Sequence, residues 1–140
     1  MPGELIKPLP PPSPKKESHI AIAFELIAVY IWIKYLIMSL NNTFVHHVHF
    51  WLKDKADQAK LIEGLNILKP ITSIRDIHIG VPADTNRDVI DRSYDASLLI
   101  LFDNKAAQDA YQDDPTHLIF VENYAKPLCA KIVVQDSVNA

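Results

Sequence analysis

Apolar residues recur with two different periods along residues 38–140, and these periods predict seven elements. Apolar, β-branched and aromatic residues at every second position are typical of strands, whereas apolar residues three or four positions apart are typical of helices. Leu61, Leu65 and Leu68 follow the helical spacing. The predicted elements are strand 44–52, helix 53–70, strand 71–82, strand 96–103, helix 104–114, helix 114–128 and strand 130–137. A polar loop, 83–95, joins the second and third strands.

The order β-α-β-β-α-α-β is a ferredoxin-like α+β arrangement whose second helix is split in two. It predicts one four-stranded antiparallel sheet with helices on one face. The other face would be bare, although strand 96–103 is apolar on both sides and Trp51 shares a face with Val45. Because an apolar sheet face needs cover, we expect a homodimer in which two copies pack sheet against sheet.

The helix 114–128 has a strong start signal. Asp114 stands at the N-cap and Pro115 at the first helical position, where its missing N–H is not needed. From the helical spacing, we expect Leu118, Val121 and Leu128 to face the core.

Residues 1–37 differ in composition from the rest of the chain. Segment 1–18 holds six of the ten prolines, which predicts an extended or disordered chain. Segment 20–37 has only two charged residues, Glu25 and Lys34, and its length is just sufficient for a membrane-spanning helix. Three interpretations remain open: a membrane anchor, a soluble buried helix, or an upstream extension joined to a domain that starts at Met38.

Charge and cysteine content narrow the function classes. The net charge of −3, without a basic stripe, gives no reason to expect nucleic acid as a partner. The single cysteine, Cys129, cannot form an internal disulfide, which fits a reducing, cytoplasmic location. Attachment to a membrane through 20–37 is the alternative. No glycine-rich phosphate loop is present, so no cofactor is expected.

The stretch "FVHHVHFW" at 44–51 concentrates three of the six histidines. Because side chains alternate across a strand, His46 points one way and His47 and His49 point the other, about 7 Å apart by two strand rises. His47 and His49 are weak metal-ligand candidates, and we expect them to line the dimer interface instead. His46 should face the helices, where it needs a hydrogen-bond partner that is either structural or part of a pocket.

Four segments, "VHHVHFWLK", "RSYDASLLILF", "AYQDDPTHLIFV" and "KIVVQDS", carry a resemblance to the stress-responsive A/B barrel (Dabb) family from about Phe44 to Val138. The resemblance implies the ferredoxin-like fold and a dimeric α/β barrel. It also implies a chain that starts just before the first strand, which favours Met38 as the start. Most members of the family have no established reaction.

One plant member of that family closes a linear polyketide by aldol condensation. Its catalytic positions correspond by resemblance to His46, Tyr111 and His117 of this sequence, whereas a further family histidine is replaced here by Asp114. In such chemistry His117 would act as a base, with its pKa lowered by the helix N-terminus. Tyr111 would donate to an enolate oxygen, and His46 would orient the pair. The alternative is that the three form a structural network.

Three functions follow from these features. The expected one is a small homodimer that acts in stress protection or binds a small hydrophobic ligand without established catalysis. The first alternative is a cofactor-free cyclase-, isomerase- or monooxygenase-like enzyme with a pocket between helices and sheet. The second is a membrane-tethered binding module. The polar loop 83–95 either rims a pocket, bridges the dimer or is simply solvated, as exposed charges usually are.

Overall fold

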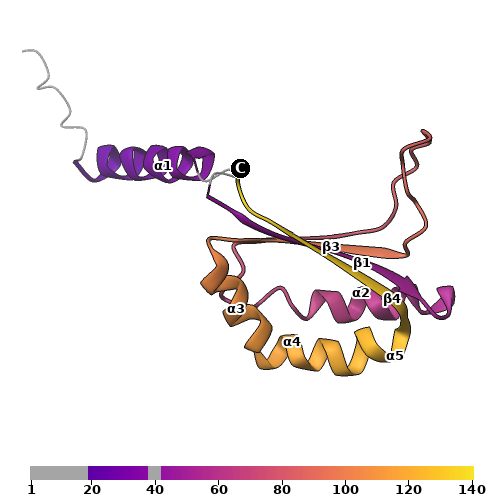
Figure 1. Cartoon of the computed structure of the whole chain (residues 1–140). Helices are drawn as coiled ribbons and strands as arrows, with labels where there is room; N and C mark the ends of the chain where they lie inside the picture. Colours follow the sequence, from indigo (N-terminus) through magenta and orange to yellow (C-terminus); the bar gives the residue numbers. More distant parts are fainter. Residues whose placement is uncertain (1–18, 38–41) are drawn as a thin grey trace, which may run out of the picture. The chain divides into compact units, whose positions relative to one another are not determined.

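The computed structural model describes residues 19–37 and 42–140 of the chain (Figure 1). The chain divides into two compact units, which are residues 1–39 and residues 40–140. In the first unit, helix α1 (His19–Ile37) exposes its apolar side chains as far as residue 34. Within the described ranges, no helix is both long enough and apolar enough to cross a membrane. The expectations for segment 1–18 and for a start at Met38 fall outside the described residues.

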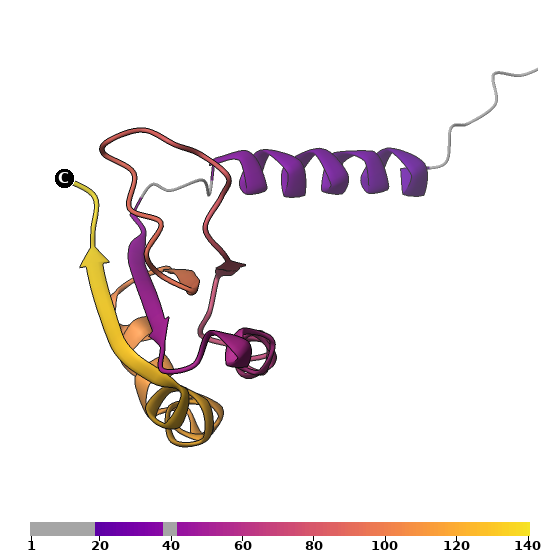
Figure 2. The same ribbon diagram turned by 90° about the vertical axis from the view of Figure 1, so that its right-hand side faces the viewer.

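The second unit is a four-stranded sheet with its helices on one face, as Figures 1 and 2 show. The strand order is β2-β3-β1-β4, and every neighbouring pair is antiparallel. This confirms the predicted ferredoxin-like α+β fold. The strands are β1 (Phe44–Leu52), β2 (Asp76–Gly80), β3 (Ala96–Phe102) and β4 (Cys129–Ser137). The helical segments are the 3₁₀ turn η1 (Lys55–Asp57), α2 (Gln58–Asn66), α3 (Lys105–Asp113), α4 (Pro115–Phe120), the π-helical segment η2 (Val121–Ala125) and α5 (Lys126–Leu128).

Capping residues define where the helices begin. The side chain of Asn104 accepts a hydrogen bond of 2.9 Å from the Ala107 N–H at the start of α3. Asp114 likewise accepts a hydrogen bond of 2.8 Å from the Thr116 N–H, with Pro115 in the first position of α4. Each cap satisfies a donor that has no partner inside its helix. The start predicted from Asp114 and Pro115 is therefore present.

The core lies between the sheet and the helices, and strand alternation explains its composition. In β1, Val48, Phe50 and Leu52 are buried toward the helices, together with His46. The helix α2 contributes the leucines at 61 and 65, in the phase that the sequence predicts. Further buried residues are Leu68, Ile71, Ala96, Leu98, Ile100, Phe102, Tyr111, Phe120, Ala125, Leu128 and Cys129.

Three predicted details are wrong. The helix expected over 53–70 is shorter, because a 3₁₀ turn covers Lys55–Asp57 and α2 covers only Gln58–Asn66. The strand expected over 71–82 is shorter, because residues 67–75 form successive turns whose buried Leu68 and Ile71 belong to the core and not to a strand. Leu118, expected in the core, is 52% exposed, and Phe120 is buried in its place. The π turn of η2 holds one residue more than an α turn, which changes the phase of the apolar pattern along this helix.

At Gly64, helix α2 packs tightly against the π-helical segment η2. A Cβ atom at this position would overlap the ring of Tyr124. We therefore predict that Gly64→Ala lowers the free energy of unfolding by about 1–3 kcal/mol through overpacking, although alanine is the better helix former. Equilibrium denaturation measures the change, and the exposed Lys60→Ala in the same helix is the control.

The double variant Gly64→Ala/Tyr124→Leu separates crowding from other causes. If the overlap with Tyr124 is responsible, the two substitutions together destabilise less than the sum of their separate effects. Strict additivity of the two changes would show that the contact is not the cause.

Candidate functional site

A pocket of about 210 Å³ lies between the inner face of the sheet and the helical segments that follow β3. It brings together His46, Tyr111 and His117, the three site residues predicted from the sequence. They come from β1, α3 and α4, so only the folded domain assembles them. The remaining residues that line the pocket are Val48, Phe50, Leu98, Gln112, Phe120, Val121, Ala125, Lys126, Ile132 and Val134.

The edge strand β4 forms the open side of this pocket. Ile132 and Val134 line it, yet they are 41% and 51% exposed. In the register of β4 with β1, these two residues lie opposite Phe50 and Val48, so all four side chains share the inner face. The pocket wall is therefore apolar, and part of it is accessible to solvent.

His46 is held by a carboxylate on the neighbouring strand. It lies directly opposite Asp136 in the β1–β4 pairing, and its Nδ1 is 2.6 Å from Asp136 Oδ1. Because a carboxylate only accepts, the histidine Nδ1–H donates, which leaves Nε2 as the acceptor nitrogen. The His46 side chain is 6% exposed and that of Asp136 is 42% exposed. The hydrogen bond thus fixes the tautomer and orientation of a buried imidazole.

Tyr111 stands between the two histidines. Its ring centroid is 5.9 Å from that of His46 and 4.4 Å from that of His117. The residue is 1% exposed, and burial raises the pKa of its phenol well above the ordinary value of 10.0. Tyr111 therefore stays protonated at neutral pH and is available as a hydrogen-bond donor.

His117 is fixed through its backbone surroundings. Its Nδ1 donates to the carbonyl oxygen of Gln112 at 3.1 Å, so Nε2 is again the acceptor. Burial lowers the pKa of His117, and the nearby His46 lowers it further, whereas the bond to Gln112 and the charge of Asp114 act in the opposite direction. The direction agrees with the sequence-based expectation, but its main cause is burial and not the helix N-terminus.

Asp136 is the residue of this site that the sequence analysis missed. It stands near the end of β4 in "IVVQDS", a stretch with no motif around it. Only the register of β1 against β4 brings it to His46, and register depends on contacts between residues 90 positions apart. The sequence gives one hint of this role, which is that an acidic residue occupies an inward-facing position of the last strand.

His47 and His49 lie on the opposite, open face of the sheet. Their ring centroids are 4.2 Å apart, and the ring of His49 is 4.7 Å from that of Tyr94. Burial lowers the pKa of His47, and the neighbouring His49 and His78 lower it further. Among residues 19–37 and 42–140, no group of three or more His, Cys, Asp or Glu side chains is placed to hold a metal ion. The pair thus lacks a third ligand within this part of the chain.

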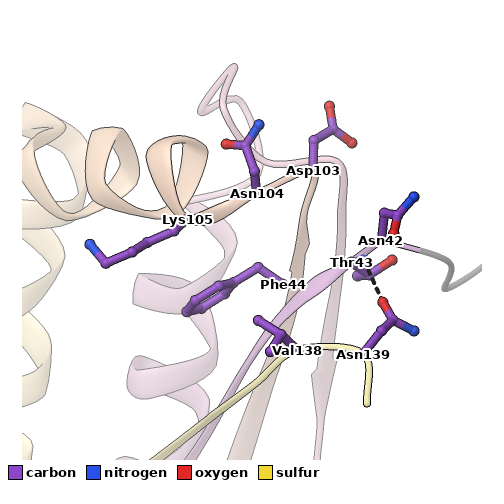
Figure 3. A pocket seen from close by; sticks show the side chains of 8 residues that line it. All are labelled: Asn42, Thr43, Phe44, Asp103, Asn104, Lys105, Val138 and Asn139. Atoms are coloured by element: carbon purple, nitrogen blue, oxygen red, sulfur yellow. Dashed lines mark hydrogen bonds between the residues drawn. The ribbon is translucent and has the colours of Figure 1, made fainter.

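Two other pockets lie away from these residues. One of about 360 Å³ is on the open face and includes His49, Trp51 and Lys131, whose Nζ lies 4.4 Å above the Trp51 ring. The other, of about 380 Å³, is drawn in Figure 3. A hydrogen bond of 2.8 Å from the Thr43 N–H to Asn139 Oδ1 closes its wall (Figure 3). Neither pocket includes any of the three predicted catalytic residues. The second pocket is lined by Asn42, Thr43, Phe44, Asp103, Asn104, Lys105, Val138 and Asn139.

Solved structures with a similar fold come from several organisms. A ferredoxin-like Dabb family protein from Mesorhizobium loti is 24% identical, with a TM-score of 0.58 over 70% of this chain and 97% of that chain. A dimeric ferredoxin-like protein of unknown function from Jannaschia sp. CCS1 is 23% identical, with a TM-score of 0.59 over 69% of this chain and 99% of that one. A hydroxynitrile lyase from Passiflora edulis is 21% identical, with a TM-score of 0.58 over 71% of this chain and 94% of the enzyme.

At these identities the structures show a shared fold and no more. No curated protein sequence matches the chain. The family profile of the stress responsive A/B barrel domain, in contrast, matches residues 44–139. This range includes all four strands and all residues of the site described above. Because this match covers more than half of the sequence, the chain belongs to the stress responsive A/B barrel (Dabb) family.

Proposed function

We propose that the chain forms a homodimer through its open sheet faces, and that each copy binds a small, largely apolar molecule in the pocket between sheet and helices. The observation that carries the proposal is the convergence of His46, Tyr111 and His117 on a pocket whose other lining residues are apolar except for Gln112 and Lys126. Pockets for drug-sized ligands measure about 300–1,000 Å³. A pocket of about 210 Å³ therefore suits a ligand of about one aromatic ring with one polar group.

The proposed homodimer covers the sheet face that the helices leave open. Leu99 and Leu101 of β3 point to this face beside His47 and Val45, and they remain half-buried in the single copy. Similar solved structures from Jannaschia and Thermobifida fusca are described as dimeric. A second copy would bury this apolar surface without adding any new element. The single cysteine, Cys129, fits a cytoplasmic location for such a dimer.

A second candidate function is cofactor-free acid–base catalysis in the same pocket. The bond from His46 to Asp136 favours it, because this arrangement stabilises the imidazolium that forms when Nε2 accepts a proton. With a small ketone, His46 would remove a proton from the carbon beside the carbonyl group, the role of base that the family resemblance implies for His117. The protonated Tyr111 would then donate a hydrogen bond to the enolate oxygen.

Ligand binding is tested by adding one-ring compounds such as benzaldehyde and phenol to the ¹⁵N-labelled protein. We expect chemical-shift changes around Tyr111 and His117, with a Kd on the order of millimolar for so small a ligand. Val134→Phe should weaken binding at least tenfold, because Val134 lines the pocket and the larger side chain fills it. Leu118→Phe, on the exposed side of α4, is the matched control. Shifts scattered over the surface, with none in the pocket, would contradict the proposal.

Acid–base chemistry is tested separately by following deuterium exchange at the methyl protons of acetophenone in D₂O. Asp136→Asn should slow exchange about tenfold and His46→Gln by about 100-fold, the typical range for a general base. His47→Gln, one residue away on the opposite face, should leave the rate unchanged. If the unaltered protein exchanges no faster than buffer, the catalytic candidate fails and the binding proposal stands.

The lowered pKa of His117 predicts a pH dependence. Because the folded protein favours the neutral imidazole, its contribution to stability is fully present above the ordinary pKa of 6.5 and is lost as the pH falls through the lower folded value. NMR titration should therefore place the midpoint for His117 below 6.5. His117→Gln should make the free energy of unfolding less sensitive to pH on the acid side. A midpoint at or above 6.5 would contradict this assignment.

A further inference from the structure

The segment that joins β2 to β3, residues 81–95, stands on the side of the sheet opposite the helices. Figures 1 and 2 show it rising well away from the open face, and it is here called the arm. The ligand pocket lies on the other side of the sheet, between the strands and the helices. The arm is therefore badly placed to act as a lid over that pocket.

The root of the arm is anchored firmly. Asp95 is 9% exposed, and its carboxylate accepts a hydrogen bond of 2.8 Å from the Leu52 N–H. Its backbone N–H donates to the Phe50 carbonyl at 2.8 Å. On the open face, the Trp51 Nε1–H donates to Ser93 Oγ at 3.0 Å. These bonds, made to two backbone groups and one side chain at the end of β1, fix the direction in which the arm leaves the sheet.

The arm also has internal order. Its outgoing and returning halves are joined by an ion pair of 3.3 Å between Asp84 and Arg92. Nearer the tip, the Ile90 N–H donates to the carbonyl of Arg87 at 2.9 Å. Ordering backbone costs about 1–2 kcal/mol per residue, so an ordered projection is favoured when it makes further contacts.

The tip of the arm carries an exposed apolar side chain. Val89 is 91% exposed, the largest exposure among the large hydrophobic residues that the structure describes, and its neighbours Asp88 and Asp91 are charged. Val81, at the base of the outgoing half, is also exposed. An apolar side chain held at the end of an anchored projection is placed where it can contact a surface outside its own subunit.

We propose that in the homodimer the arm of each copy embraces the second copy, with Val89 buried against the partner. The inference rests on the proposed sheet-to-sheet dimer, whose interface is continuous with the root of the arm at Trp51 and Tyr94. The dimensions agree: sheets that pack face to face lie about 10 Å apart. Each half of the arm, with about seven residues, spans up to about 23 Å when extended. The arm is thus long enough to pass the level of the partner's sheet.

Sedimentation velocity of the full chain over a range of concentrations tests the arm. We expect Val89→Asp to raise the dimer dissociation constant roughly 100-fold, tenfold for each of the two arms, where each tenfold equals about 1.4 kcal/mol. Ile119→Asp is the matched control, since Ile119 is a half-exposed apolar residue on the helical side. Circular dichroism and denaturation of both variants show whether the fold is retained, and Val89→Ser provides a milder change at the same position.

The results of this experiment distinguish the proposed contact of the arm from the proposed homodimer itself. If Val89→Asp weakens the dimer and Ile119→Asp does not, the result supports the contact between the arm and the second copy. A dimer that neither substitution weakens, or that both weaken equally, overturns the arm while the homodimer stands. An unaltered chain that stays monomeric at every concentration overturns the homodimer, and the arm with it.

Discussion

The position of β1 inside the sheet determines on which face each of its three histidines lies. This strand pairs with β3 on one side and with β4 on the other, so its register is set twice. A slip of one residue would move every side chain of the strand to the opposite face. His46 would then leave the pocket, and His47 would enter the core. The apolar inner residues Val48 and Phe50, both almost fully buried, oppose such a slip.

The alternation of side chains along β1 places different groups on the two faces of the sheet. On the inner face, an imidazole, a phenol and a second imidazole stand in a row at the wall of an apolar pocket. On the outer face, His49, Trp51 and Tyr94 form an aromatic surface that continues into the root of the arm. In the proposed homodimer, the small molecule and the second copy would therefore bind on opposite sides of the sheet and would not compete for the same surface.

Local patterns predicted much of this fold, and non-local contacts account for what they missed. The alternation along 44–52 correctly separated His46 from His47 and His49, because a strand's faces depend on neighbouring residues alone. The limits of β2 were wrong because buried apolar turn residues such as Ile71 look like strand residues in a sequence. The π turn at η2 shifts the phase of the helical pattern, and the partnership of His46 with Asp136 depends on the pairing of strands that are distant in sequence. A single sequence carries no direct sign of either.

The bond between His46 and Asp136 joins the first strand of the domain to its last, across 90 positions. During synthesis a chain emerges from its N-terminal end, and contacts between such distant residues form late and slowly. The β1–β3 pairing and helix α2 can form while β4 is still being translated. One wall of the pocket and the carboxylate that orients His46 are contributed by β4. A chain in which β4 has not yet paired can therefore acquire part of the fold without the complete site.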